Sequence, residues 1–130
     1  MVKALIILPE PFSGGQSIKG ATLAIESWTS GEVEQYVAPL HVHYADDEAW
    51  HVVSGALRFR IAGEEIVADA GSTVLVPAGT PHTFGNAGPG PACYIIILPI
   101  RLQRLISHLH ASEQVRHPAI YQRYRSALLE

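Results

Sequence analysis

The chain has 130 residues, of which 48% are apolar and 16% charged, and its net charge is −3 at pH 7. This length indicates one domain, residues 1–130, that can bury a core. The acidic balance argues against a nucleic-acid partner or an anionic membrane surface, and no apolar stretch reaches the ~18 residues of a membrane span. Cys93 is the only cysteine, which rules out an internal disulfide and suits a cytoplasmic protein.

Short β-like segments dominate the first hundred residues. The apolar start, residues 4–9, is interpreted as a first strand because acidic and proline residues follow it at once. Further strands are predicted over residues 22–28, 32–38, 48–53, 57–61, 64–68, 73–76, 81–85 and 92–98. Leu57, Phe59 and Ile61 alternate with arginines, and Ala62-Gly63 then predicts a tight turn. Many short strands at close spacing predict an all-β sandwich or barrel, with its core over residues 20–99.

The tail, residues 100–130, changes to a helical period. One apolar face contains Leu102, Leu105, Ile106 and Leu109. Pro118 suits the first turn of a second helix, for which we expect an apolar stripe of Ile120, Tyr121, Tyr124 and Leu128. These helices are expected to cap the barrel or to form a dimer contact.

The side chains that suggest chemistry are histidines and one glutamate. On a strand, the spacing of His41-Val42-His43 points both rings to one face, with Cα atoms ~6.6 Å apart, so both can reach a common ion. Glu48 opens the next strand, and a hairpin of this length could return its carboxylate to that ion. His82 follows a stiff turn at residues 77–81. Taken singly, each is more often a structural or solvated side chain than a ligand.

The spacing of these residues along the chain is a more specific indication of function than their types alone. After His-x-His come four residues, Glu48, six residues and Gly55. Later, five residues follow Gly71 before Pro77-Ala78-Gly79, two more precede His82, and three more precede Asn86. These two strings resemble the two signature motifs of the cupin superfamily, in its small single-domain form. One position departs, because Gln35 occupies the place of the glycine that usually opens the first motif.

The resemblance implies a fold and a site. The fold is a double-stranded β-helix, or jelly roll, followed here by a short helical tail, with one ion inside the barrel near its mouth. The implied metal ligands are His41, His43, Glu48 and His82. Turn residues would be Gly55, Gly71, Pro77 and Gly79, and Asn86 would be structural.

The ligand set suits several divalent transition metals. Imidazole with carboxylate accommodates Fe, Mn, Ni, Co, Cu or Zn, and the missing thiolates argue against a structural zinc site. Among proteins that resemble this chain, iron and manganese are the usual ions.

Other candidates surround the ligands in the sequence. Trp50 and Val52 share strand parity with Glu48, and Phe84 shares it with His82, so all three are candidates for a substrate pocket, with plain core packing as the alternative. Tyr44 and Gln35 are candidate catalytic residues, as a proton donor and a hydrogen-bond partner, with exposed polar residues as the alternative.

Three functions remain open from the sequence. The resemblance favours a dioxygenase, in which an ion couples dioxygen to a small enolate or phenolate substrate. The alternatives are a non-redox isomerase, lyase or cyclase, and a module that binds or senses a small molecule without turnover. In each case the partner is a small molecule, and we expect a homodimer.

Overall fold

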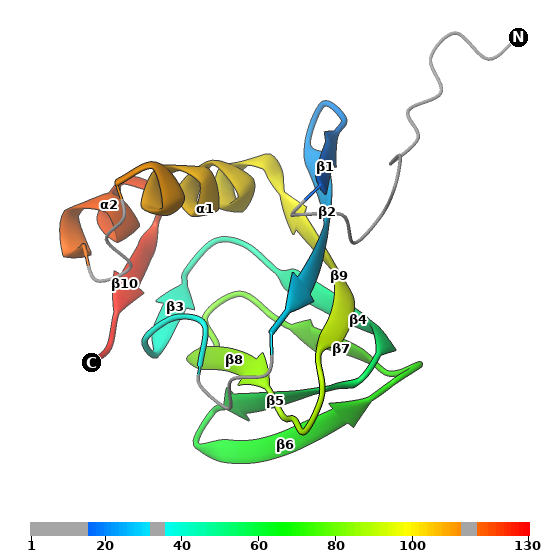
Figure 1. Ribbon diagram of the computed structural model, residues 1–130. Coiled ribbons are helices and arrows are strands. Elements are labelled where there is room, and N and C mark those ends of the chain that lie inside the picture. The colour runs from blue at the N-terminus through cyan, green and yellow to red at the C-terminus, as the bar shows by residue number, and fades with distance from the viewer. Residues whose placement is uncertain (1–15, 32–35, 113–116) are drawn as a thin grey trace, which may run out of the picture.

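The structure, a computed structural model, describes residues 16–31, 36–112 and 117–130. These parts of the chain form two antiparallel five-stranded sheets (Figure 1). The first sheet has the order β1 (Gln16–Lys19), β2 (Leu23–Ser30), β9 (Ala92–Pro99), β4 (Glu48–Ser54) and β7 (Thr73–Val76). The second has the order β10 (Ser126–Leu128), β3 (His41–His43), β8 (His82–Asn86), β5 (Ala56–Ile61) and β6 (Glu64–Asp69). The predicted all-β jelly roll is therefore confirmed.

The core lies between the sheets because alternate residues of their strands are apolar. In β9, every second residue from Ala92 to Leu98 is buried, and in β4 Trp50 and Val52 are buried on the same face as Glu48. A strand turns successive side chains to opposite faces, so this period of two aligns the apolar side chains along the interior. Glu48 consequently begins β4 with its carboxylate directed into the barrel.

Two turns follow directly from local sequence. The predicted tight turn at Ala62-Gly63 is confirmed: both residues have positive φ, and they join β5 to β6 as a two-residue hairpin. Gly55 also has a positive φ, of 73°. A Cβ at that position would lie 2.4 Å from the carbonyl oxygen of Pro91, so the close approach of two backbone segments requires glycine there.

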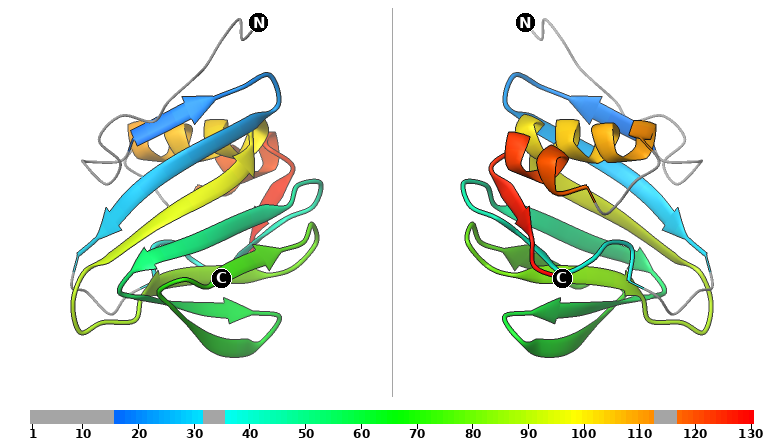
Figure 2. Two further views of the ribbon diagram at one scale, coloured as in Figure 1. Left: turned by 90° about the vertical axis from the view of Figure 1, so that its right-hand side faces the viewer. Right: turned by 90° about the vertical axis from the view of Figure 1, so that its left-hand side faces the viewer.

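Two helices follow the last strand of the first sheet. Helix α1 (Ile100–Ser112) lies on the inner side of β2 and β9 and closes one end of the barrel (Figure 2). Its predicted apolar stripe is buried in the same core as the strands, through Leu102, Leu105 and Leu109. Helix α2 (Pro118–Arg123) follows, with Pro118 in its first turn as predicted. Neither helix is long and apolar enough to cross a membrane.

The end of the chain differs from the prediction. A second helix reaching Leu128 was expected, and this is wrong: α2 ends at Arg123, and the φ of 55° at Arg125 reverses the chain. Residues 126–128 then form β10, which pairs antiparallel with β3. Strand β3 pairs with β8 on one side only, and its other edge would be left without hydrogen bonds. Pairing of residues 126–128 with that edge outweighs their helical sequence pattern. Both sheets thus extend beyond residues 20–99.

Two of the predicted strands lie wholly or partly outside the described residues. The first strand, residues 4–9, lies outside the described residues, as does the first half of the strand expected over residues 32–38. Of its second half, Tyr36 forms a single β-bridge with Gly85.

Candidate metal centre

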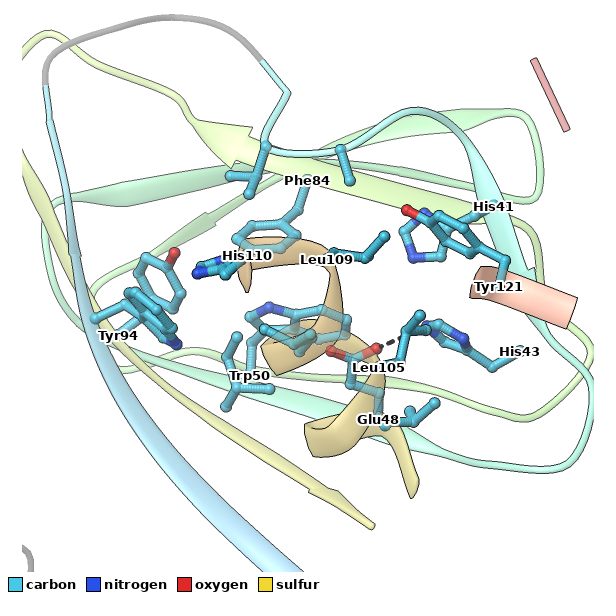
Figure 3. A pocket seen from close by; sticks show the side chains of 16 residues that line it. His41, His43, Glu48, Trp50, Phe84, Tyr94, Leu105, Leu109, His110 and Tyr121 are labelled. Atoms are coloured by element: carbon cyan, nitrogen blue, oxygen red, sulfur yellow. Dashed lines mark ion pairs between the residues drawn. The ribbon is translucent and has the colours of Figure 1, made fainter. Parts of the chain in front are cut away.

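Four side chains that lie far apart in the sequence meet inside the barrel. His41 and His43 lie on β3, and His82 begins β8, directly opposite His41 in the strand pairing. The three imidazoles offer nitrogens within 4.8 Å of one another. The Glu48 Oε1 atom lies 3.3 Å from Nε2 of His43 and 3.6 Å from Nε2 of His82. All four side chains are buried, and Figure 3 shows the carboxylate directed at His43.

Each imidazole is held at its outer nitrogen. The Nδ1 atom of His41 lies 2.7 Å from the carbonyl oxygen of Pro39, and that of His82 lies 2.9 Å from the carbonyl oxygen of Thr80. A carbonyl oxygen can only accept, so both Nδ1 atoms carry the hydrogen. Their Nε2 atoms consequently face inward, and an imidazole with its hydrogen on Nδ1 binds a metal through Nε2.

His43 is oriented by the end of the chain. Its Nδ1 lies 2.7 Å from Oγ of Ser126 in β10, and that hydroxyl donates to the carbonyl oxygen of Tyr124 at 3.1 Å. Because the hydroxyl hydrogen of Ser126 is donated to Tyr124, the Ser126 oxygen accepts a hydrogen bond from Nδ1–H of His43. The sequence offered no signal for Ser126, because 83 residues separate it from the histidine that it orients.

Electrostatics favour the charge states that a cation requires. Burial, together with the nearby imidazoles of His82 and His43, lowers the pKa of His41 to about 3. His41 is therefore neutral at physiological pH. Burial alone would raise the pKa of Glu48, but the adjacent side chains of His43 and His82 outweigh it and lower that pKa to about 2. A neutral imidazole and an ionised carboxylate are the forms in which these groups ligate metals.

The geometry fits a metal ion better than a self-contained hydrogen-bond network. The Nε2 atom of His82, which is only 1% exposed, has no hydrogen-bond partner in the described part of the chain. A buried polar atom without a partner is costly and rare. Nitrogens bound ~2.1 Å from one ion lie ~3–3.5 Å apart as neighbours, so rings whose nitrogens lie within 4.8 Å of one another could converge on an ion through modest side-chain movement. The site could therefore hold a divalent metal ion.

A cavity of about 160 Å³ adjoins three of the four side chains, those of His41, His43 and Glu48. Trp50 and Phe84 line it, as the sequence suggested for a substrate pocket. Val52, the third candidate, is fully buried in the core but is not among the described residues that line the cavity. Two residues further along β4, it lies beyond the cavity in the packed interior.

Part of the cavity wall comes from residues that were not predicted to lie near the ligands. Helix α1 contributes its apolar face, including Leu105 and Leu109, and α2 contributes Tyr121, whose ring centroid is 5.6 Å from that of His41. Trp28 and Tyr94 line the cavity from β2 and β9. Helical and strand periodicity identified many of these as buried, but periodicity cannot say which core residues border a cavity.

Of the two candidate catalytic residues, Tyr44 is the one that the structure describes, and it is not at the cavity. Tyr44 is 59% exposed and is not among the described residues of the cavity wall. Its backbone N–H donates to the carbonyl oxygen of Arg125. Gln35 lies outside the described residues. Asn86, expected to be structural, is buried and bonds through its side-chain amide to the backbone of Gly31, Gly88 and Gly90.

The fold and the ligand set define a class of protein: a small jelly-roll barrel with three histidines and a glutamate gathered inside it. A family model described as "Cupin domain" matches residues 31–98. The chain belongs to the cupin family. Among curated proteins, no sequence matches it.

Solved structures agree on the fold. A cupin protein, BF4112 from Bacteroides fragilis, is 15% identical with a TM-score of 0.64, over 76% of this chain and 86% of that one. BH2720 from Bacillus halodurans is 20% identical with a TM-score of 0.60, over 68% and 70%. A cupin-superfamily sugar phosphate isomerase from Silicibacter pomeroyi is 21% identical with a TM-score of 0.54, over 68% and 60%.

A protein from Acidithiobacillus ferrooxidans is also similar, with 20% identity and a TM-score of 0.55 over 60% of this chain. The present chain spans half the length of that protein. At these identities the likeness concerns the fold.

Proposed function

We propose that this protein is a metal-dependent enzyme of the dioxygenase type that acts on a small, apolar, chelating molecule. The observation that carries the proposal is the convergence of three buried imidazoles and one carboxylate beside an apolar cavity, whose wall includes His41, His43 and Glu48. Iron or manganese is the preferred ion, since the ligand set of neutral nitrogens and one carboxylate suits both. The ligands would be His41, His43, Glu48 and His82.

The lining of the cavity supports an apolar substrate. Apart from the ligands, its wall consists chiefly of aromatic and aliphatic side chains, among them Trp50, Phe84 and Leu105. None of the described residues in the wall is a lysine or an arginine. Phosphate groups are usually bound by such cations or by helix N-termini, so a phosphorylated sugar is a poor fit to this cavity.

The side chains of the chain have defined tasks in this proposal. Iron or manganese bound there would supply the redox chemistry that lets dioxygen react with a chelating enolate or phenolate. His41, His43 and His82 hold the ion through Nε2, while Glu48 reduces its net charge. Leu105 and Leu109 of α1 exclude water from the cavity, and Trp50 and Phe84 hold the apolar body of the substrate in place.

Proton-transfer chemistry is less well supported. An isomerase or lyase needs a base close to the substrate. Outside the ligands, His110 is the one described wall residue that ordinarily titrates near neutral pH. It is exposed and lies on the Tyr94 side of the cavity, away from His41 and His43 (Figure 3). A redox reaction of a molecule that binds already deprotonated, as its enolate or phenolate, needs no such base and therefore suits the site better.

Two measurements test the proposal. Elemental analysis of protein purified without oxygen is expected to find about one iron or manganese per chain, and zinc at full occupancy would contradict the dioxygenase. Oxygen uptake is then measured with single-ring catechols and small β-diketones, and consumption above a metal-free control is expected. Tight binding without oxygen uptake would instead indicate a binding module.

A further inference from the structure

The cavity wall contains a buried hydrogen-bond donor that is unpaired among the described residues. Trp50 is 1% exposed, and its indole Nε1 has no hydrogen-bond partner in the described part of the chain. Trp28 also lines the cavity, but its Nε1 donates to Oε1 of Glu26 at 3.1 Å. A buried tryptophan N–H normally finds a partner, and leaving one unpaired is costly. Trp50 therefore lacks an acceptor that a ligand could provide.

A second polar group lies on the same side of the cavity. Tyr94 is 4% exposed and lines the wall, and its hydroxyl makes no hydrogen bond within residues 16–31, 36–112 and 117–130. The ring centroid of Phe84 is 5.2 Å from that of Trp50 and 5.5 Å from that of Tyr94, so one ring packs against both. The Trp50 and Tyr94 side chains therefore both contact the ring of Phe84.

These donors are separated from the metal ligands along the cavity. The Trp50 ring contacts His82 at a centroid distance of 5.9 Å, and Tyr94 lies beyond Trp50 at the opposite end from His41 and His43 (Figure 3). An apolar cavity of ~150 Å³ holds one benzene ring. The 160 Å³ available here therefore suits a single-ring molecule that extends from the ligands past Trp50.

We propose that the cavity selects a single-ring molecule whose outer end carries an uncharged acceptor oxygen, which receives hydrogen bonds from the Trp50 indole and the Tyr94 hydroxyl. This inference rests on the proposed function, since it names the substrate class of the same cavity. The metal ligands would take the chelating end of the molecule. The absence of lysine and arginine from the described wall matches a carbonyl, ether or hydroxyl oxygen rather than a carboxylate or a phosphate.

The donor pair can be tested with ligands that do not chelate. Acetophenone and ethylbenzene have nearly the same shape and size, and differ in that acetophenone has a carbonyl oxygen. The protein has two tryptophans, so its ¹H–¹⁵N spectrum has two indole signals, which the Trp28→Phe variant assigns. We expect acetophenone to bind about fivefold more tightly and to shift the Trp50 indole proton downfield. Equal affinities with no such shift would overturn the proposal.

Variants identify the donors. Trp50→Phe is expected to abolish the preference for acetophenone, and Tyr94→Phe to reduce it. Trp28→Phe is the matched control, because it removes an indole from the same wall whose N–H is already paired; the preference should persist in it. If Trp50→Phe does not fold, the proposal is tested by two other measurements: the ligand preference of Tyr94→Phe, and the shift of the Trp50 indole proton in the unmodified protein. A preference unchanged in Tyr94→Phe, together with an unmoved Trp50 signal, would contradict the inference.

The test of the Trp50 and Tyr94 donors can fail or succeed independently of the proposed metal-dependent function. The metal content of each sample is measured by elemental analysis before titration. Metal-free protein that still prefers acetophenone would contradict the dioxygenase proposal but support the donor pair. Fully metallated protein without this preference would contradict only the donor pair.

Discussion

Each imidazole of the site depends on a partner that fixes its outer nitrogen. His41 and His82 donate to carbonyl oxygens within their own strand–turn segments, so their orientation is set locally. His43 relies on Ser126, a residue from the far end of the chain. The result is a set of inward-facing Nε2 atoms around the carboxylate of Glu48. Because the rings are held in place, binding an ion requires little further ordering of side chains.

Removal of single ligands should release the metal without unfolding the barrel. We expect His41→Ala or His82→Ala to retain less than about a tenth of the metal of the unmodified protein, since each loses one of four donors. Glu48→Gln should lose less, because an oxygen donor remains while the charge is lost. Metal content is measured by elemental analysis, and folding by circular dichroism.

His51 provides the matched control for these variants. It lies on β4 with Glu48 but on the outer face, where Nδ1 bonds to Oγ1 of Thr73 at 2.8 Å. His51→Ala should therefore keep its metal. Full metal retention in both His41→Ala and His82→Ala would show that these residues do not form the site.

Replacing Gly55, the glycine of the first motif, should destabilise the fold for steric reasons. In Gly55→Ala the new Cβ would meet the carbonyl oxygen of Pro91 at 2.4 Å, in addition to the cost of a positive φ. We expect the free energy of unfolding to fall by about 3 kcal/mol. Gly71 also has a positive φ, but open space surrounds it, so Gly71→Ala should cost only about 1 kcal/mol. Urea denaturation measures both, and equal losses would contradict the steric explanation.

At the scale of elements, the short strand β10 holds the ligand strand β3 in place. The two strands pair over residues 126–128 and 41–43. Further backbone bonds flank this pairing, from Tyr44 to Arg125 and from Leu129 to Leu40. The tail that was expected to be helical thus contributes a strand to the sheet that carries three of the four proposed ligands, His41, His43 and His82.

Loss of the Ser126 hydroxyl should weaken metal binding while leaving the four ligands intact. In Ser126→Ala the Nδ1 hydrogen of His43 has no acceptor, and we expect about a tenfold loss of metal affinity. Competition with a chromophoric chelator measures that affinity. Ser107→Ala is the control, since Ser107 is exposed on α1 and accepts a hydrogen bond from Gln103. Equal affinities in the two variants would contradict an orienting role for Ser126.

At the scale of the whole molecule, the edge strand β6 offers a surface for self-association. Strand β6 lies at the edge of the second sheet, and five of its six residues are exposed, including Val67 at 59%. Exposed apolar edge strands favour pairing with another chain. The expected homodimer therefore has a candidate interface here, in a part of the molecule away from the C-terminal helices (Figure 1).

Sedimentation equilibrium tests the homodimer. We expect a mass twice the 14.1 kDa of the chain. Val67→Lys should shift the protein towards the monomer, because a charge on an apolar edge opposes pairing. Lys19→Ala, at the edge strand β1 of the other sheet, should leave the mass unchanged. A mass of one chain for the unmodified protein would contradict the homodimer.

The sequence by itself determined the barrel, most strand positions and the approach of four candidate ligands. This was possible because strand periodicity and turn residues are local, and because the motif spacing places His41, His43, Glu48 and His82 at fixed points of the fold. Only the tertiary structure decided that residues 126–128 form a strand, since Leu128 fits a helical stripe equally well. It also decided that α1 closes the cavity, that Val52 lies outside its wall and that Trp50 lacks a partner. Such features depend on contacts between distant segments, which no local pattern records.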